Sequence, residues 1–446
     1  MICAASSGLG GILLAGAALA AAAPASAMSL SEALQRARVH DPAVAVSAAQ
    51  YEADREEGRA ERSTLLPSLA AGGNYYHART DFASPYGGAD DGYQGWSAQA
   101  EARQALFRLD WFARRDRARA LDARAETAYR ERELEVLLRV ADRYFSVLLA
   151  QDRLAQAEAE AQAVRESLED TRKRYEVEIV PGTDLKEAQA RDDLAQARLL
   201  SARIGFETAQ EALAEITGVD EPLLPVLPQD VAFPPLAPAS ADAWVEAARE
   251  QSPRIALARQ AAEIAETQRK STLSAAMPAL DLVASASRDD ASEYAFGQLR
   301  DDQRIGVELS MPIYAGGLNA ARLRQAEASA VAAQADLRRV TLETERETRQ
   351  RYRQVATAYH EADAYRRSLE SALAAQAATQ AGYDAGTRTI TDVLDAKSRV
   401  VQARRDLNET RYNLLLSLLQ LRQLTGELSA EDFARIDRLL RYPPAH

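Results

Sequence analysis

The sequence predicts a mainly α-helical protein in which one unit is used twice, each copy carrying a long helical hairpin and a pair of strands. Three observations predict this. Residues from about 30 to 218 recur, with changes, from about 241 to 426. Two runs of about seventy residues lack proline and keep heptad spacing. Short segments between the helices alternate apolar and polar residues. A repeat of this length implies one half of a fold used twice around a pseudo-two-fold axis.

The duplication is visible as residues that recur at a constant spacing. Pro42 and Pro67 recur 211 positions later as Pro253 and Pro278. Beyond the strands the spacing becomes 208, so a net change of three residues falls between, and we expect it in a loop. The pairs 208 positions apart are Tyr144 and Tyr352, Tyr175 and Tyr383, Asp184 and Asp392, and Ala188 and Ala396.

The composition argues against several classes of function. The 446 residues are rich in Ala, Arg, Glu, Gln and Leu, and a formal net charge of −12 argues against a nucleic-acid partner. Cys3 is the single cysteine, and the four histidines lack metal-ligand spacing. Because the sequence has no Gly-rich phosphate loop and no nucleophile motif, we expect no enzyme, no cofactor and no metal site.

The N-terminus has the pattern of a secretory signal peptide. Residues 8–23 are apolar and are followed by Ala25-Ser26-Ala27, a small-x-small cleavage pattern, which predicts a signal peptide over 1–27. The alternative is an uncleaved membrane anchor. No Lys or Arg precedes Arg36, so the true start codon could differ from Met1. Cys3 precedes the apolar run, which argues against N-terminal lipidation. We expect an exported protein.

The first elements of the mature chain are a helix and a strand hairpin. Residues 30–65 have helical spacing, ended by Leu66-Pro67. Residues 96–103 alternate strictly, which predicts a strand, and its partner falls at 68–80. Residues 80–92, rich in Gly and Asp, predict a long hairpin loop.

The second copy repeats this order and separates the strand faces more clearly. Leu280, Leu282, Ala284 and Ala286 share one face of a strand, and Ile305, Val307, Leu309 and Met311 share one face of the next. Ten-residue strands with this alternation are typical of an outer-membrane barrel, although a soluble sheet packed on helices is the alternative. Four strands cannot close a barrel, so the membrane interpretation requires several chains to share one.

Three aromatic residues of the first strand pair leave two alternatives open. Trp96, Tyr75 and Tyr76 could form a belt at the membrane interface, where such rings are favoured. They could equally fill space between strand and helix.

Each strand pair is followed by a long helix and a returning helix. Helical spacing runs from Asp110 to about Val177 and from Asn319 to about Ala385, each roughly 100 Å long at 1.5 Å per residue. A helix of this length must bury its apolar seam against a partner helix. The returning helices, Asp184–Thr217 and Asp392–Thr425, supply that partner.

The turns at 178–183 and 386–391 therefore form the far tips of two hairpins. Thr183 and Thr391 are the predicted N-caps of the returning helices.

These segments give a domain plan. Residues 221–240 contain six prolines and predict a semi-rigid linker, and residues 431–441 predict a short helix. The plan is a signal peptide at 1–27, repeat 1 at 28–220, the linker at 221–240, repeat 2 at 241–427 and a C-terminal tail at 428–446.

Two motifs make the chain resemble the TolC family of outer-membrane efflux and secretion channels over essentially all of its mature length. They are Met311–Gly317, which enters the second long helix and is matched by Leu106-Phe107 in the first copy, and Tyr383–Ala396 at the second tip. The resemblance implies a mainly α fold with a membrane β-barrel. Its duplicated hairpins would form a trimeric α-helical barrel across the periplasm, below a shared 12-stranded β-barrel in the outer membrane.

The resemblance also implies partners. A homotrimer would meet outer-membrane lipid, a periplasmic adaptor protein and an inner-membrane transporter, in a tripartite efflux pump or a type I secretion system. The transported substrate, whether drug, metal or protein, is not encoded. The alternative is a periplasmic coiled-coil adaptor or structural protein without a barrel, which would not explain the alternating strands.

At the tips, the resemblance assigns roles to particular residues. Asp392 and Asp395 match an acidic ring that narrows the periplasmic entrance; three positions apart, they share a helix face. The alternative is ordinary first-turn acids favoured by the helix dipole. The residues matching the family's closed-tip latch are Thr183, Asp184, Tyr383 and Arg388. The expected adaptor contacts are Glu178, Ile179, Gly386 and Thr387, and Glu187 matches Asp395 across the duplication.

Overall fold

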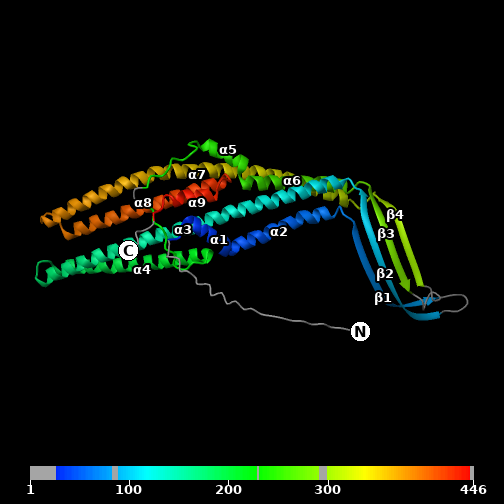
Figure 1. Ribbon diagram of the computed structural model, residues 1–446, viewed down its shortest axis with the longest axis horizontal. Helices are drawn as coiled ribbons and strands as arrows, with labels where there is room; N and C mark the ends of the chain where they lie inside the picture. The colour runs from blue at the N-terminus through cyan, green and yellow to red at the C-terminus, as the bar shows by residue number, and fades with distance from the viewer. Residues whose placement is uncertain (1–26, 83–88, 229–230, 291–298, 442–446) are drawn as a thin grey trace, which may run out of the picture.

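The computed structural model describes residues 27–82, 89–228, 231–290 and 299–441. A four-stranded sheet lies at one end of an elongated molecule, and long helices run from it to the opposite end (Figure 1). The predicted signal peptide lies outside the described residues except for Ala27, and Cys3 lies there too.

The two copies contain the same elements in the same order. The first copy contains α1 (Leu30–His40), α2 (Pro42–Ser63), β1 (Ser68–Phe82), β2 (Ala89–Phe107), α3 (Asp110–Glu176) and α4 (Gly182–Thr217). The second contains α5 (Ala241–Gln251), α6 (Pro253–Ser274), β3 (Ala279–Asp290), β4 (Leu299–Ser310), α7 (Leu318–Asp384) and α8 (Ile390–Leu424), and α9 (Ala430–Asp437) follows. The predicted long helices, returning helices and strand pairs are confirmed.

Two predictions for the first copy are wrong in detail. The helix predicted over 30–65 is broken at Asp41, whose side chain caps α2 by accepting from the Ala43 amide at 2.8 Å, with Pro42 at the first helical position. Most of the loop predicted over 80–92 is strand, because pairing continues to Phe82 opposite Ala89. Glycine and aspartate lower strand propensity but do not prevent pairing in a long hairpin.

The sheet has the order β1-β2-β3-β4, with every neighbouring pair antiparallel. Leu282 pairs with Val307 and Ala284 with Ile305, so the predicted apolar faces of β3 and β4 coincide. The opposite face carries charged residues, including the pair Asp281 and Glu308. Met311 follows the end of β4 instead of lying in it. The confirmed alternation gives the sheet one apolar and one polar face.

Tyr75 and Trp96 are paired across β1 and β2. Tyr75 is 72% exposed, which contradicts the alternative that it fills space between strand and helix. Its place in a membrane belt stays a prediction.

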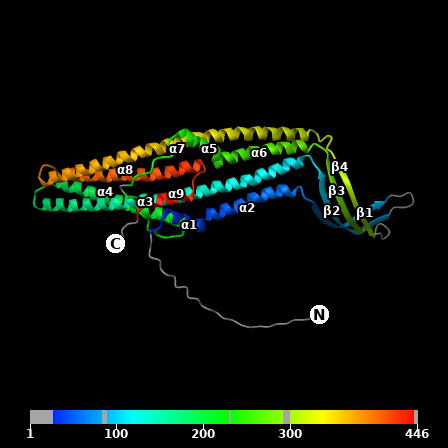
Figure 2. The same cartoon turned by 45° about the horizontal axis from the view of Figure 1, so that its top comes forward.

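The long helix α3 changes partners along its length. Its first half packs on α2 and α6, with Arg132 bonded to Asp54 and Gln260 to Thr127, and its second half packs on α4. Helix α7 similarly packs on α5 and α6 and then on α8. Figure 2 shows these helices running side by side from the sheet to the tips. Each long helix therefore buries its seam against different shorter helices in its two halves.

The main hydrophobic core lies midway along the molecule, where α1 and α9 cover the long helices (Figure 1). Tyr144 is fully buried there and donates to the Met28 carbonyl at 3.0 Å. A smaller cluster surrounds Trp244 of α5, and a third, around Leu369 and Leu407, holds the α7–α8 hairpin together. The core is thus concentrated at the middle, a region we call the waist.

The predicted linker at 221–240 packs onto the waist. Leu224 and Leu227 are buried, and Tyr352 and Tyr359 donate to the carbonyls of Ala239 and Pro234, both at 2.6 Å. The linker residues that the structure describes are therefore held against the helices that they connect. In the tail, the predicted short helix is confirmed as α9, and residues 442–446 lie outside the described ranges.

Among the described helices, none combines the length and the apolar composition needed to cross a membrane.

Candidate functional site

The hairpin tips are the first candidate site, and their turns are closely related. Glu178 and Gly386, 208 positions apart, both adopt left-handed backbone conformations, with φ of 59° and 75°. After the bend, the amide of Ile179 donates to the Arg174 carbonyl and that of Thr387 to the Gly382 carbonyl, both at 2.8 Å. A left-handed conformation costs a non-glycine residue roughly 1–2 kcal/mol, so the first tip stores strain that the second does not.

Both predicted N-caps are wrong by two residues. Helix α4 begins at Gly182 after Pro181, and Thr183 lies inside its first turn, bonded to Asp184 at 3.2 Å. Helix α8 begins at Ile390, and Thr389 is its cap. Thr389 and Asp392 form a reciprocal capping box, which the sequence signals as Thr-x-x-Asp.

Asp392 therefore has a defined structural role. Its carboxylate accepts from the amide and the hydroxyl of Thr389, both at 2.9 Å. These hydrogen bonds, with a smaller contribution from Arg388, hold the pKa of Asp392 below its ordinary value. The carboxylate is ionised at neutral pH, as either a cap or a pore residue requires.

Asp395 lies one turn further along α8 and is tied to the other hairpin. Arg191 of α4 reaches it at 3.3 Å and also bonds Glu187 at 2.9 Å. The Asp395 side chain is 56% exposed. One guanidinium thus bridges the two acids that correspond across the duplication, and an exposed pair of this kind contributes up to about 1 kcal/mol.

Within the described part of one protomer, no hydrogen bond or ion pair joins the predicted latch residues of the first hairpin to those of the second. Tyr383 accepts a 2.5 Å hydrogen bond from Arg174 of α3, whose guanidinium also lies 5.5 Å from the ring centre. Among the residues that the structure describes, no hydrogen bond or ion pair connects Asp184 with Tyr383 or Arg388. The sequence did not indicate that Arg174 would join the hairpins, because the lateral alignment of two hairpins has no local signal.

A partly buried carboxylate joins the hairpins further from the tip. Asp152 of α3 accepts from Asn408 at 2.8 Å and from Tyr412 at 3.2 Å, both on α8. Burial raises the pKa of Asp152, and burial beside this carboxylate raises the pKa of Tyr412. Polar groups between packed helices need hydrogen-bond partners. The bonds of Asp152 to Asn408 and Tyr412 therefore fix the register of α3 against α8.

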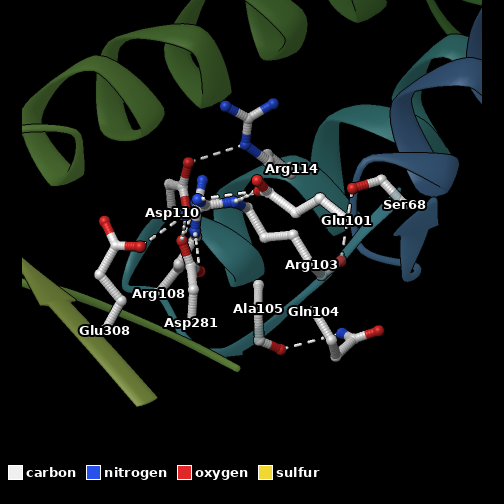
Figure 3. A network of polar contacts seen from close by, with 10 residues as sticks. All are labelled: Ser68, Glu101, Arg103, Gln104, Ala105, Arg108, Asp110, Arg114, Asp281 and Glu308. Atoms are coloured by element: carbon white, nitrogen blue, oxygen red, sulfur yellow. Dashed lines mark hydrogen bonds and ion pairs between the residues drawn. The ribbon is translucent and has the colours of Figure 1, made fainter. Parts of the chain in front are cut away.

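The second candidate site is the junction between sheet and helices. Asp281 of β3 lies between Arg103 of β2 and Arg108, which precedes α3 (Figure 3). Arg108 donates to both carboxylate oxygens, at 3.2 and 2.8 Å, and Arg103 lies 3.4 Å from Asp281 and 3.3 Å from Glu308. Only 4% of the Asp281 side chain is exposed. Because this carboxylate is buried, its two arginine partners compensate a charge that would otherwise be costly.

The tips and the junction offer charge and shape but no catalytic constellation. In the described part of the chain, no group of three or more His, Cys, Asp or Glu side chains is arranged to hold a metal ion. The contacts at both sites hold long elements of the fold in register.

The chain matches the protein-family model described as "Outer membrane efflux protein" over residues 33–219 and 244–427. These two segments fall on the two copies of the repeat.

Comparison with individual proteins agrees with this family match. The chain is 33% identical over 420 residues to the outer membrane protein TolC of Vibrio cholerae, which covers 93% of this chain and 94% of that protein. It is 28% identical over 413 residues to the alkaline protease secretion protein AprF of Pseudomonas aeruginosa, covering 91% and 86%. Among solved structures, the outer membrane protein VceC of Vibrio cholerae superimposes with a TM-score of 0.73 at 18% identity, covering 89% of this chain and 96% of VceC.

Proposed function

Because the chain belongs to the outer membrane efflux protein family, we propose that three copies assemble into one tunnel that carries substrates from a periplasmic adaptor and an inner-membrane transporter to the exterior. The protein is an outer-membrane channel for efflux or type I secretion. The family is one of channel proteins, not of enzymes.

The open sheet of the single chain supports the trimer most directly. β1 and β4 lie at its edges, and Ile305, Val307 and Leu309 are 78%, 60% and 70% exposed on the apolar face of β4. In lipid, an open edge would leave backbone groups unsatisfied, so copies must pair edge to edge. Three copies of four strands give twelve, arranged with the apolar face toward lipid and the charged face toward the lumen.

The assembly can be tested on the full chain in detergent. We expect native mass spectrometry to show a trimer, and we expect the protein to require detergent for solubility. In planar bilayers it should form ion-conducting channels. A monomer that stays soluble without detergent would contradict the proposal and favour the coiled-coil alternative.

We infer that Asp392 and Asp395 narrow the periplasmic entrance as two carboxylate rings. Their place in the first turns of α8, at the end opposite the sheet, supports this (Figure 1). Three copies would bring six carboxylates around one axis, although Arg191 partly neutralises each Asp395. Replacing both with Asn should lower the cation selectivity, measured as the reversal potential in a salt gradient. Glu158→Gln, which changes an exposed acid far from the tip, is the control. An unchanged reversal potential in the Asp392 and Asp395 double variant would exclude the carboxylate rings.

The adaptor is proposed to contact the two tip turns, at Glu178, Ile179, Gly386 and Thr387. Ile179 is 69% exposed, and its neighbour Val177 is 63% exposed. Exposed apolar side chains at the end of an otherwise polar hairpin are typical of an interaction surface. Replacing Ile179 with Ser should weaken adaptor binding in a pull-down of the assembled channel, whereas Lys173→Gln, one turn before the tip, should not.

A further inference from the structure

A groove between the two hairpins, separate from the tip turns, has the features of a small-molecule site. It has a volume of about 400 Å³ and is lined by residues of all four hairpin helices, α3, α4, α7 and α8. This volume falls within the range of ligand sites in proteins.

The groove has an apolar side that is incompletely covered. Leu194 of α4 and Leu373 of α7 line the groove from the two hairpins. Leu194 is 52% exposed and Leu373 is 41% exposed. Val401 of α8 also lines it. An apolar ligand that covers these exposed leucines removes their side chains from water, which favours binding.

The charges of the groove are unbalanced. Arg198 is paired with Glu160 at 2.8 Å, and Arg191 with Asp395 at 3.3 Å. Two further basic residues of α8 line the groove, and neither Lys397 nor Arg404 has a hydrogen bond or an ion pair among the residues that the structure describes. The Nε atom of Arg404 is shielded from solvent without a hydrogen-bond partner. A shielded donor of this kind is costly until an acceptor satisfies it.

We propose that this groove binds a small amphipathic anion, in which one carboxylate or sulfonate is attached to an apolar body. The anionic group contacts Lys397 and Arg404, and the apolar body covers Leu194 and Leu373. Basic side chains outnumber acidic ones in the lining of the groove by four to two, which favours anions over cations and neutral compounds, and the apolar lining selects against small inorganic anions. The proposal depends on the groove and not on channel activity, so the two can fail independently.

The test uses the full chain in lipid nanodiscs, with naphthalene-2-sulfonate as the probe and isothermal titration calorimetry as the measurement. Empty nanodiscs give the contribution of the bilayer. We expect saturable binding of the sulfonate, with at least tenfold weaker binding of the neutral 2-naphthalenemethanol and of methanesulfonate. Absence of saturable sulfonate binding, or equal binding of the neutral alcohol, would overturn the proposal.

Substitutions of Lys397 and Arg404 test whether the sulfonate binds in the groove. Lys397→Gln and Arg404→Gln should each weaken sulfonate binding about tenfold, as expected for the loss of one charge-assisted contact. Lys397→Arg should retain binding, which shows that the charge and not the lysine is needed. Lys173→Gln removes the same charge from an exposed position outside the groove and should leave binding unchanged. Circular dichroism establishes that each variant is folded. Equal affinities for Lys397→Gln and the unmodified protein would refute the assignment.

Discussion

At the scale of single residues, the two tips carry different residues at the one position where both turns need a left-handed backbone conformation. Glu178 and Gly386 occupy matching places and both have positive φ, but only glycine adopts this conformation without cost. A Cβ atom at Gly386 would meet nothing within 4 Å, so the backbone angle alone determines the effect of a substitution there.

We therefore expect Gly386→Ala to destabilise the second tip by roughly 1–2 kcal/mol, which is about a five- to thirtyfold loss of amide protection. Hydrogen exchange at Thr387, whose amide closes the turn, is the measurement. Gly205→Ala is the matched control. Gly205 lies within α4 with open space around it, and the same substitution there should stabilise the helix by roughly 0.5–1 kcal/mol. If both substitutions changed stability in the same direction, the backbone conformation of Gly386 would not be the cause of the effect.

Residues also show where the sequence was informative and where it was not. Helical periodicity and the absence of proline predicted the ends of α3 and α7 to within about one residue. Both are local signals, which a sequence shows directly. The N-caps predicted at Thr183 and Thr391 are wrong because each returning helix begins earlier, after Pro181 and after Thr389. Arg174, Arg191 and Asp152 were not predicted as links, since their partners lie more than two hundred residues away.

At the scale of elements, the contact between α3 and α8 determines how the hairpins lie against each other. Asp152 is its centre, bonded to Asn408 and Tyr412. Burial raises its pKa in the folded protein, so its contribution to stability is largest below the unfolded pKa and is lost as the pH rises through the raised value.

The element-scale prediction compares two substitutions of Asp152. Asp152→Asn keeps an acceptor and removes the partly buried charge, so the stability of this variant should equal or exceed that of the unmodified protein at pH 8. The dependence of its stability on pH should flatten above pH 4. Asp152→Ala leaves the partners of Asp152 unsatisfied and should cost roughly 1–3 kcal/mol. The measurement is the thermal midpoint in detergent at a fixed scan rate, from pH 4 to pH 8. Glu158→Gln changes an exposed acid of the same helix and serves as the control; Asn and Ala variants of equal stability would disprove the role assigned to Asp152.

At the scale of the whole molecule, the proposed latch must act between copies. Within one protomer, the described contact of Asp184 is with Thr183, and Tyr383 is bonded to Arg174. Asp184 and Arg388 are both exposed at the tips, where a neighbouring copy could reach them.

We expect Asp184→Ala or Arg388→Ser to raise the single-channel conductance in planar bilayers, because either removes a link that keeps the tips together. Lys186→Ala, two residues from Asp184 on the same exposed turn, should leave the conductance unchanged. Conductance that stays constant in both latch variants would exclude the latch. An equal rise with Lys186→Ala would show a general loosening of the turn instead.

The position of the hydrophobic core has a mechanical consequence. Nearly all of the large buried side chains gather at the waist, whereas each tip is held by a few polar contacts and a narrow helical seam. Local opening costs least where few apolar contacts must break. We therefore expect local opening of the tips to require less free energy than opening of the waist, so that the hairpin ends loosen before the helices at the middle of the molecule separate.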